Sequence, residues 1–179
     1  ILPMTTLKDN EIYAPQFKDG ETVVCIRYPH EGRYQIPQLT VNNKNAEGKR
    51  IITPGAIDAV GINAKVAERL SGADFDGDTV LVIPNNAQPN GKRLIKVDPP
   101  LEGLKNFDAK ESYPGYKGMK VMTHAQTQME MGKISNLVTD MTLQGATPEE
   151  LARATKHANC IIDAEKHKLD WHRSEKENR

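Results

Sequence analysis

Two different hydrophobic patterns divide this chain of 179 residues. Between Glu21 and Pro100, short β-branched runs alternate with Gly, Pro and Asn, which is the pattern of short strands and turns. From about His124 onwards, helix-forming residues predominate. This order predicts an α+β fold, in which a small β-barrel or sandwich is followed by a helical hairpin. The runs expected to form strands are Thr22–Ile26, Leu39–Val41, Arg50–Ile52, Thr79–Ile83 and Leu94–Val97.

Local signals place the remaining elements. A helix is expected at about Asn63–Leu70, because its small apolar residues share one face and Ser71-Gly72 offers a stop. The turn residues of Asn85–Gly91 predict a hairpin between the last two strands. Thr147-Pro148-Glu149-Glu150 is a capping box that begins a helix reaching about Leu169. The expected buried stripe of that helix is Leu151, Ala154, Ala158, Ile161 or Ile162, and Leu169.

These signals predict five segments along the chain. They are an N-terminal arm (1–20), a β-barrel with an acidic loop (21–100), a linker (101–121), a helical hairpin (122–172) and a charged tail (173–179). The numbering begins at Ile1 rather than at a methionine, so we expect a piece of a longer chain.

Charge and cysteine content exclude some classes of protein. Lys plus Arg equals Asp plus Glu at 24 each, so any attraction to phosphate must come from local patches or from metal. Cys25 and Cys160 lie far apart, which favours a reducing cytoplasm over a disulfide framework. His157 and Cys160 lie three residues apart without a second ligand pair, so we expect no zinc site there. No apolar run approaches membrane-spanning length, and we expect a soluble protein without a membrane partner.

The run Asp74-Phe75-Asp76-Gly77-Asp78 is the main candidate site. It concentrates three carboxylates, and like charges at ~5 Å repel by about 3 kcal/mol per pair at an effective dielectric near 20. A hard divalent cation, Mg²⁺ or Mn²⁺, reverses that sign. Gly77 permits positive φ, and Phe75 can anchor the loop in the core. An EF-hand fails on spacing, because glycine is fourth in this run and Asn85 is twelfth. An acidic surface turn and a structural calcium clamp stay open as alternatives.

The same residues resemble a known family. Ala73-Asp74-Phe75-Asp76-Gly77-Asp78 is similar to the aspartate signature of the two-barrel RNA polymerases, and most of all to the silencing-type RNA-dependent RNA polymerases and their phage relatives. Arg27-Tyr28-Pro29 resembles that family's Arg-x-Pro segment. Gly132–Asn136 and Ile162–Lys166 resemble helical segments that follow the barrel in those enzymes. The resemblance spans roughly Val23 to Lys166, and the aspartate run is its specific part.

The resemblance implies a fold, a site and partners. It implies a double-psi β-barrel in which Asp74, Asp76 and Asp78 are catalytic and hold Mg²⁺ or Mn²⁺, while Arg27 binds the nucleotide's ribose. A solvated strand-end arginine is the alternative for Arg27. The implied partners are a nucleic-acid template, the RNA product, ribonucleoside triphosphates and a second barrel. We find no second barrel in this sequence, so we expect it elsewhere in a parent chain or on a partner chain, and we expect the isolated chain to be inactive.

Three functions remain in competition. The first is the metal-binding portion of a templated RNA polymerase. The second is a non-catalytic metal-binding barrel that assembles with a partner chain. The third is a metal-dependent phosphohydrolase or nuclease, because acids with Mg²⁺ suit that chemistry too. A DNA or RNA template, and a cellular, phage or mobile-element origin, are all compatible with the sequence.

Overall fold

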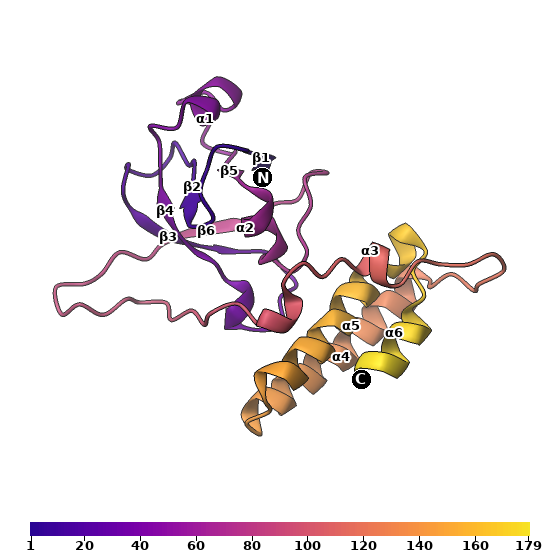
Figure 1. Ribbon diagram of the computed structural model, residues 1–179. Helices are drawn as coiled ribbons and strands as arrows, with labels where there is room; N and C mark the ends of the chain where they lie inside the picture. The colour runs from indigo at the N-terminus through magenta and orange to yellow at the C-terminus, as the bar shows by residue number, and fades with distance from the viewer. The chain divides into compact units, whose positions relative to one another are not determined.

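The computed structural model describes residues 1–179. It divides into two compact units, Ile1–Pro99 and Pro100–Arg179. The first unit contains β1 (Leu2–Pro3), β2 (Glu11–Ile12), β3 (Thr22–Ile26), η1 (Arg33–Gln35), β4 (Gln38–Val41), α1 (Ala46–Ile51), β5 (Gly61–Ile62), α2 (Ala64–Glu68) and β6 (Leu81–Pro84). The second contains η2 (Glu102–Leu104), α3 (Ala109–Ser112), α4 (His124–Leu143), α5 (Pro148–His167) and α6 (Trp171–Asn178). Figure 1 labels these elements, apart from the two 3-10 helices.

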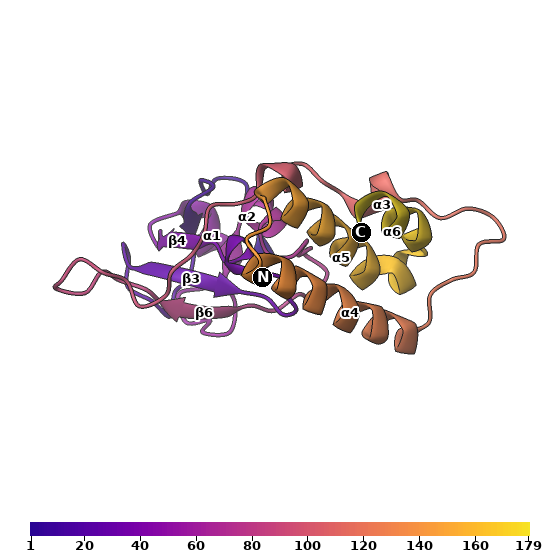
Figure 2. The same ribbon diagram turned by 90° about the horizontal axis from the view of Figure 1, so that it is seen from below.

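Two small sheets form the frame of the first unit. The larger sheet has the order β2-β4-β3-β6, with β2 parallel to β4 and the other neighbours antiparallel. The second sheet pairs β1 with β5 in parallel. Figure 2 shows β3 and β6 side by side. The strands form these two separate sheets, and a closed double-psi β-barrel stays a prediction.

The apolar residues of the sheets pack into a core that also includes α2. Its fully buried members come from strands β2 to β5, from α2 and from the residues that follow β2 and α2: Ile12, Ala14, Val23, Cys25, Leu39, Val41, Ile62, Val66 and Leu70. A smaller cluster joins Met4, Leu7 and Tyr13 of the N-terminal segment with Ile52 at the end of α1. The segment 1–20, predicted as an arm, therefore belongs to the core of this unit.

Two predicted strands are wrong. Arg50–Ile52 is not a strand, because Asn45 caps a helix there: its Oδ1 accepts a hydrogen bond from Gly48 N at 2.8 Å, and α1 runs to Ile51. Leu94–Val97 is not a strand either, because the side chain of Asn85 takes up the backbone N–H and C=O of Ile95. The strand predicted at Thr79–Ile83 begins two residues later, as β6. The strands predicted at Thr22–Ile26 and Leu39–Val41 are confirmed as β3 and β4.

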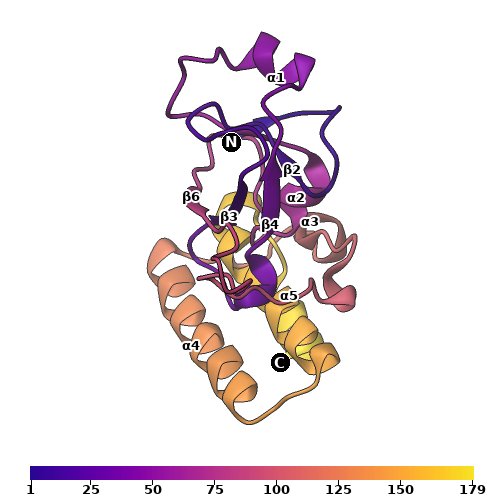
Figure 3. The same ribbon diagram turned by 90° about the vertical axis from the view of Figure 1, so that its left-hand side faces the viewer.

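Helices α4 and α5 form the frame of the second unit, where a short turn joins them and they pack against each other. The capping box at Thr147 is confirmed, with Pro148 in the first turn of α5. The predicted stripe faces the core, and Ile161 rather than Ile162 is fully buried. Residues 101–121, predicted as a linker, contain η2 and α3 and contribute the buried Tyr113. Figure 3 shows α4 and α5 as two long helices joined at one end.

The C-terminal residues form a helix rather than a frayed tail. Asp170 caps α6 by accepting from Arg173 N, and Ser174 is buried against α5. Ion pairs at helical spacing, Arg173 with Glu177 and Arg179 with Glu175, line its exposed side. No helix of the protein is long and apolar enough to cross a membrane.

Candidate metal site

Helix α2 brings the chain to the aspartate loop. Asn63 caps the helix through a bond from Val66 N to its Oδ1, which confirms the predicted start. The chain then turns through Ser71 and Gly72, which have φ values of 54° and 67°. Leu70 is fully buried at this turn, so the position of the following loop is set by the core.

The backbone of the loop folds back on itself. Asp74 N donates to Asp78 Oδ2 at 3.0 Å, and Asp76 N approaches Asp74 Oδ1 at 3.4 Å. Gly77 has φ of 119°, a conformation that favours glycine, and the space where a Cβ would lie is open. Glycine is therefore required at position 77 for its backbone conformation, and not because a larger side chain would clash. Phe75 packs against the core of the first unit, as the sequence predicts.

The three carboxylates converge. Asp74, Asp76 and Asp78 each offer an oxygen, and these oxygens lie within 4.8 Å of one another. An octahedral Mg²⁺ shell with bonds of about 2.1 Å brings any two ligand oxygens within about 4.2 Å. Separations of at most 4.8 Å are therefore close to what an Mg²⁺ shell needs, and they also lie within the reach of the longer bonds of Ca²⁺. No other place in the chain gathers three or more His, Cys, Asp or Glu ligands in this way.

Arg27 joins the cluster from the end of β3. Its Nε lies 2.9 Å from Asp78 Oδ2, and its Nη2 donates to Asp78 Oδ1 at 3.1 Å, so the pair is bidentate. Nη1 donates to the carbonyl oxygen of Ser71 at 3.2 Å. The side chains of Arg27 and Asp78 are only 17% and 19% exposed. The antiparallel register of β3 and β6, which pairs Ile26 with Leu81, is what brings the two residues together.

The charges of this group suit a divalent cation. Three carboxylates and one guanidinium leave a formal charge of −2 on the four side chains. Asp76 is the exposed member, while Asp74 and Asp78 are partly buried. Both oxygens of Asp78 already accept hydrogen bonds, so full ligation by Asp78 would require Arg27 to give way. The residues thus fit a cation, with Arg27 as a competitor for one ligand.

The sequence identified all four residues but not their mutual contact. Arg27 was expected to face a ribose, whereas its guanidinium is bound to Asp78. Arg27 and Asp78 are 51 residues apart in the chain, and the register of β3 and β6 brings them together. No local sequence signal indicates such a pair. The backbone N of Ile1 also bonds to Asp78 O at 2.8 Å, which was not anticipated.

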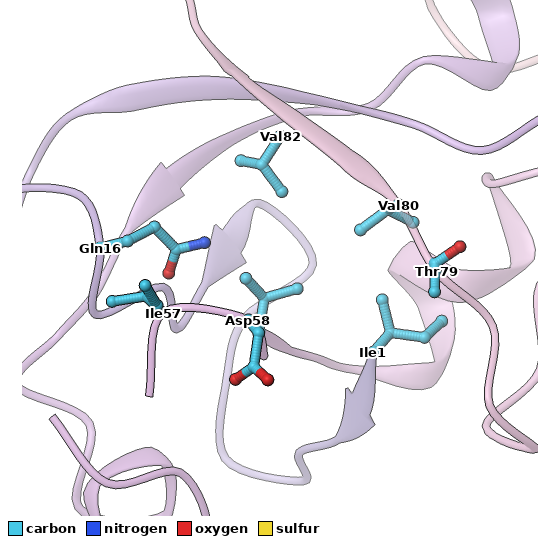
Figure 4. Close-up of a pocket in the computed structure, with 8 residues that line it drawn as sticks. Ile1, Gln16, Ile57, Asp58, Thr79, Val80 and Val82 are labelled. Carbon is cyan, nitrogen blue, oxygen red and sulfur yellow. The ribbon is translucent and has the colours of Figure 1, made fainter. Parts of the chain in front are cut away.

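A cavity of about 190 Å³ lies beside the strand that follows the loop. Its walls are Ile1, Gln16, Ile57, Asp58, Val60, Thr79, Val80 and Val82. Figure 4 shows Val80 and Val82 along one side, with the Asp58 carboxylate on the other. None of the four site residues lines this cavity, so it is separate from the carboxylate cluster.

His157 and the two cysteines are buried and belong to the packing of the protein. His157 is buried and its Nδ1 lies 3.0 Å from Ser174 Oγ, while burial raises the pKa of the Cys160 thiol to about 12. Burial likewise raises the pKa of Cys25 to about 12, so both thiols are protonated and poor metal ligands at neutral pH. The segments Gly132–Asn136 and Ile162–Lys166 lie within α4 and α5.

Comparisons of this chain with protein-family models, with curated proteins and with solved structures found no match, so the family resemblance depends on the residues quoted for it.

Proposed function

We propose that this chain is the catalytic-metal-binding portion of a nucleic-acid-templated RNA polymerase, a nucleotidyltransferase that works with a second barrel outside this sequence. The observation that supports it most is the convergence of Asp74, Asp76 and Asp78 within 4.8 Å. Arg27, the other residue expected from the resemblance, lies in direct contact with that cluster.

Each of the four residues has a role in this proposal. Asp74, Asp76 and Asp78 would hold Mg²⁺ or Mn²⁺, and the bound cation supplies charge stabilisation for a 3′-hydroxyl and a triphosphate during phosphoryl transfer. Asp76, the exposed member, is the first to meet an incoming cation. Arg27 is the counter-charge of Asp78 when no cation is bound, and a bound cation would free its guanidinium for ribose hydroxyls.

Metal binding is the first test. We would titrate Mn²⁺ into the protein and follow the free ion by electron paramagnetic resonance, comparing wild type with Asp76→Asn. Removing one ligand charge is expected to weaken binding by at least about tenfold. Asp58→Asn is the matched control, because it removes an exposed carboxylate from the same unit and should change the affinity less than about twofold. Equal affinity in wild type and Asp76→Asn would refute the site.

RNA synthesis is the second readout, in the assembly that contains the second barrel. With an RNA primer, a template and ribonucleoside triphosphates, Asp76→Ala should reduce extension by at least about 10³-fold, since it removes a ligand of the metal that stabilises the transition state. Metal binding without extension by that assembly would instead support the non-catalytic module. Metal-dependent cleavage of the strand, lost in Asp76→Ala, would indicate a nuclease.

A further inference from the structure

A basic segment follows β6 at the end away from the aspartate loop. We call residues 86–97 the basic arm; it contains Lys92, Arg93 and Lys96, and no acidic residue. The whole chain has equal numbers of basic and acidic residues, so this is a local excess of positive charge. Figures 1 and 2 both show the arm as a long loop that extends away from the sheet.

Asn85 anchors the base of this arm. It is 1% exposed, and its side-chain amide donates to Ile95 O at 2.9 Å while its Oδ1 accepts from Ile95 N at 2.9 Å. Asn85 O also accepts from the Arg93 guanidinium. At the far end, Asp98 pairs with Arg33, with 3.1 Å between Oδ2 and Nε. The arm is therefore held at both ends rather than being a loose connection.

The cations of the arm are available to an external partner. The ammonium groups of Lys92 and Lys96 make no ion pair or hydrogen bond within the chain, and both residues are exposed. They are not counter-ions of the aspartate cluster, because Arg27 has that role and β6 separates the two regions. Exposed cations without partners gain most from an external polyanion, which loses its condensed counter-ions on binding.

The neighbouring side chains indicate which polyanion fits. Gln88 and Asn90 add neutral hydrogen-bond donors, whereas the Asn86 amide already donates to Glu21 at 3.2 Å. The arm has no aromatic ring on which a base could stack. Leu94 is its one large exposed apolar residue, at 76%, which is too little to insert stably into a bilayer. This combination suits phosphates and sugars more than bases or lipid tails.

We infer that the basic arm binds the phosphate backbone of a nucleic-acid strand without reading its sequence. The preference for nucleic acid over other polyanions rests on the proposed function, but the electrostatic contact itself does not need the metal site. RNA binding measured in EDTA therefore tests the arm separately from the metal site. A loss of RNA binding would not contradict metal binding, and a lack of metal binding would not contradict RNA binding by the arm.

The test measures binding of a fluorescein-labelled single-stranded RNA of about 12 nucleotides by anisotropy, in EDTA. Each phosphate contact contributes about −0.7 to the slope of log affinity against log salt. Contacts by Lys92, Lys96 and the N–H groups of Arg93 that do not bind Asn85 make three, which predicts an affinity loss of about 18-fold between 50 and 200 mM salt. Lys92→Ala with Lys96→Ala should leave one contact and a loss of only about 2.6-fold. Neither side chain has a partner within the chain, so the fold should be unaffected.

The matched control is Lys117→Ala with Lys120→Ala, which removes the same charge from exposed residues of another loop. This control should keep the wild-type salt slope. An unchanged slope in the arm variant, or an equal loss in the control, would overturn the inference. Competition by poly-glutamate as strong as by unlabelled RNA would also overturn it, because the arm would then be a general polyanion site. Binding to phosphatidylserine vesicles in preference to RNA would assign the arm to a membrane surface instead.

Discussion

At the scale of single residues, the pair of Arg27 and Asp78 decides how the carboxylates coexist. Three carboxylates this close repel one another, and in the structure Arg27 compensates the charge of Asp78, whose side chain is partly buried. Because the pair is mostly buried, neither charge can be removed without leaving its partner poorly solvated. The same arginine that stabilises the loop is therefore a competitor of a bound cation.

Arg27→Leu should destabilise the metal-free protein by about 2 kcal/mol, because it leaves Asp78 beside two other carboxylates without its two charged hydrogen bonds. Urea denaturation in EDTA measures this cost. Arg33→Leu is the control: its ion pair with Asp98 is about half exposed, and its loss should cost less than about 1 kcal/mol. Saturating Mn²⁺ should reduce the cost of Arg27→Leu. Equal costs for the two substitutions would show that the bidentate pair has no special weight.

At the scale of elements, buried polar contacts position segments that propensity alone leaves undefined. Helix α6 is short and highly charged, yet it docks on α5 where Ser174 meets His157. Burial lowers the pKa of His157 to about 4, and it is fully enclosed between α5 and α6 together with Cys160. Glu175 and Glu130 favour its charged form, while Arg179 opposes it, but burial is the largest cause.

Stability should therefore fall as the pH drops from 6.5 towards 4. In this window the unfolded chain takes up a proton on His157 and the folded chain does not, so protonation favours unfolding. One pKa unit corresponds to about 1.4 kcal/mol, so the fall from 6.5 to about 4 sets an upper bound of about 3.5 kcal/mol on the loss. Denaturation at several pH values measures it. His157→Gln should lack most of this loss, and the exposed His124→Gln should retain it. A parallel pH dependence in wild type and His157→Gln would contradict this account.

At the scale of the whole molecule, each unit has a hydrophobic core of its own. The cores of the first unit include residues from Met4 to Ala73, and that of the second runs from Ala109 to Leu169. Every residue of the carboxylate cluster, and Arg27 with it, belongs to the first unit. Folding of the first unit is therefore enough to assemble the candidate metal site.

Residues 1–99 should fold without residues 100–179 and bind Mn²⁺ with an affinity within about twofold of the full chain, since no ligand is lost. The dispersion of amide signals in a two-dimensional NMR spectrum tests folding, and the Mn²⁺ titration tests the site. The Asp76→Asn form of the same fragment is the control, because it should fold equally well but bind weakly. A collapsed spectrum for residues 1–99 would show that the two units depend on each other.

The structure follows from the sequence where a few adjacent residues decide it. Thr147 with Glu150, and Asn63 ahead of α2, satisfy helix N-termini through contacts only three residues apart. Arg50–Ile52 and Leu94–Val97 are different, because their β-branched residues favour strands that the structure does not form. At Arg50–Ile52 the Asn45 cap stabilises a helix, and at Leu94–Val97 the buried Asn85 binds the backbone of Ile95. Both effects outweigh the weak intrinsic preference for a strand.

By itself, the sequence determined that Asp74, Asp76 and Asp78 share one loop and that Gly77 allows it to turn, because neighbours in the chain cannot be far apart in space. Only the tertiary structure decided that Arg27 compensates Asp78 and that Asn85 holds the returning basic arm. Those contacts depend on strand register and on which polar groups lose their contact with water when the chain folds. Such groups must find partners within the fold, and local sequence does not specify which ones.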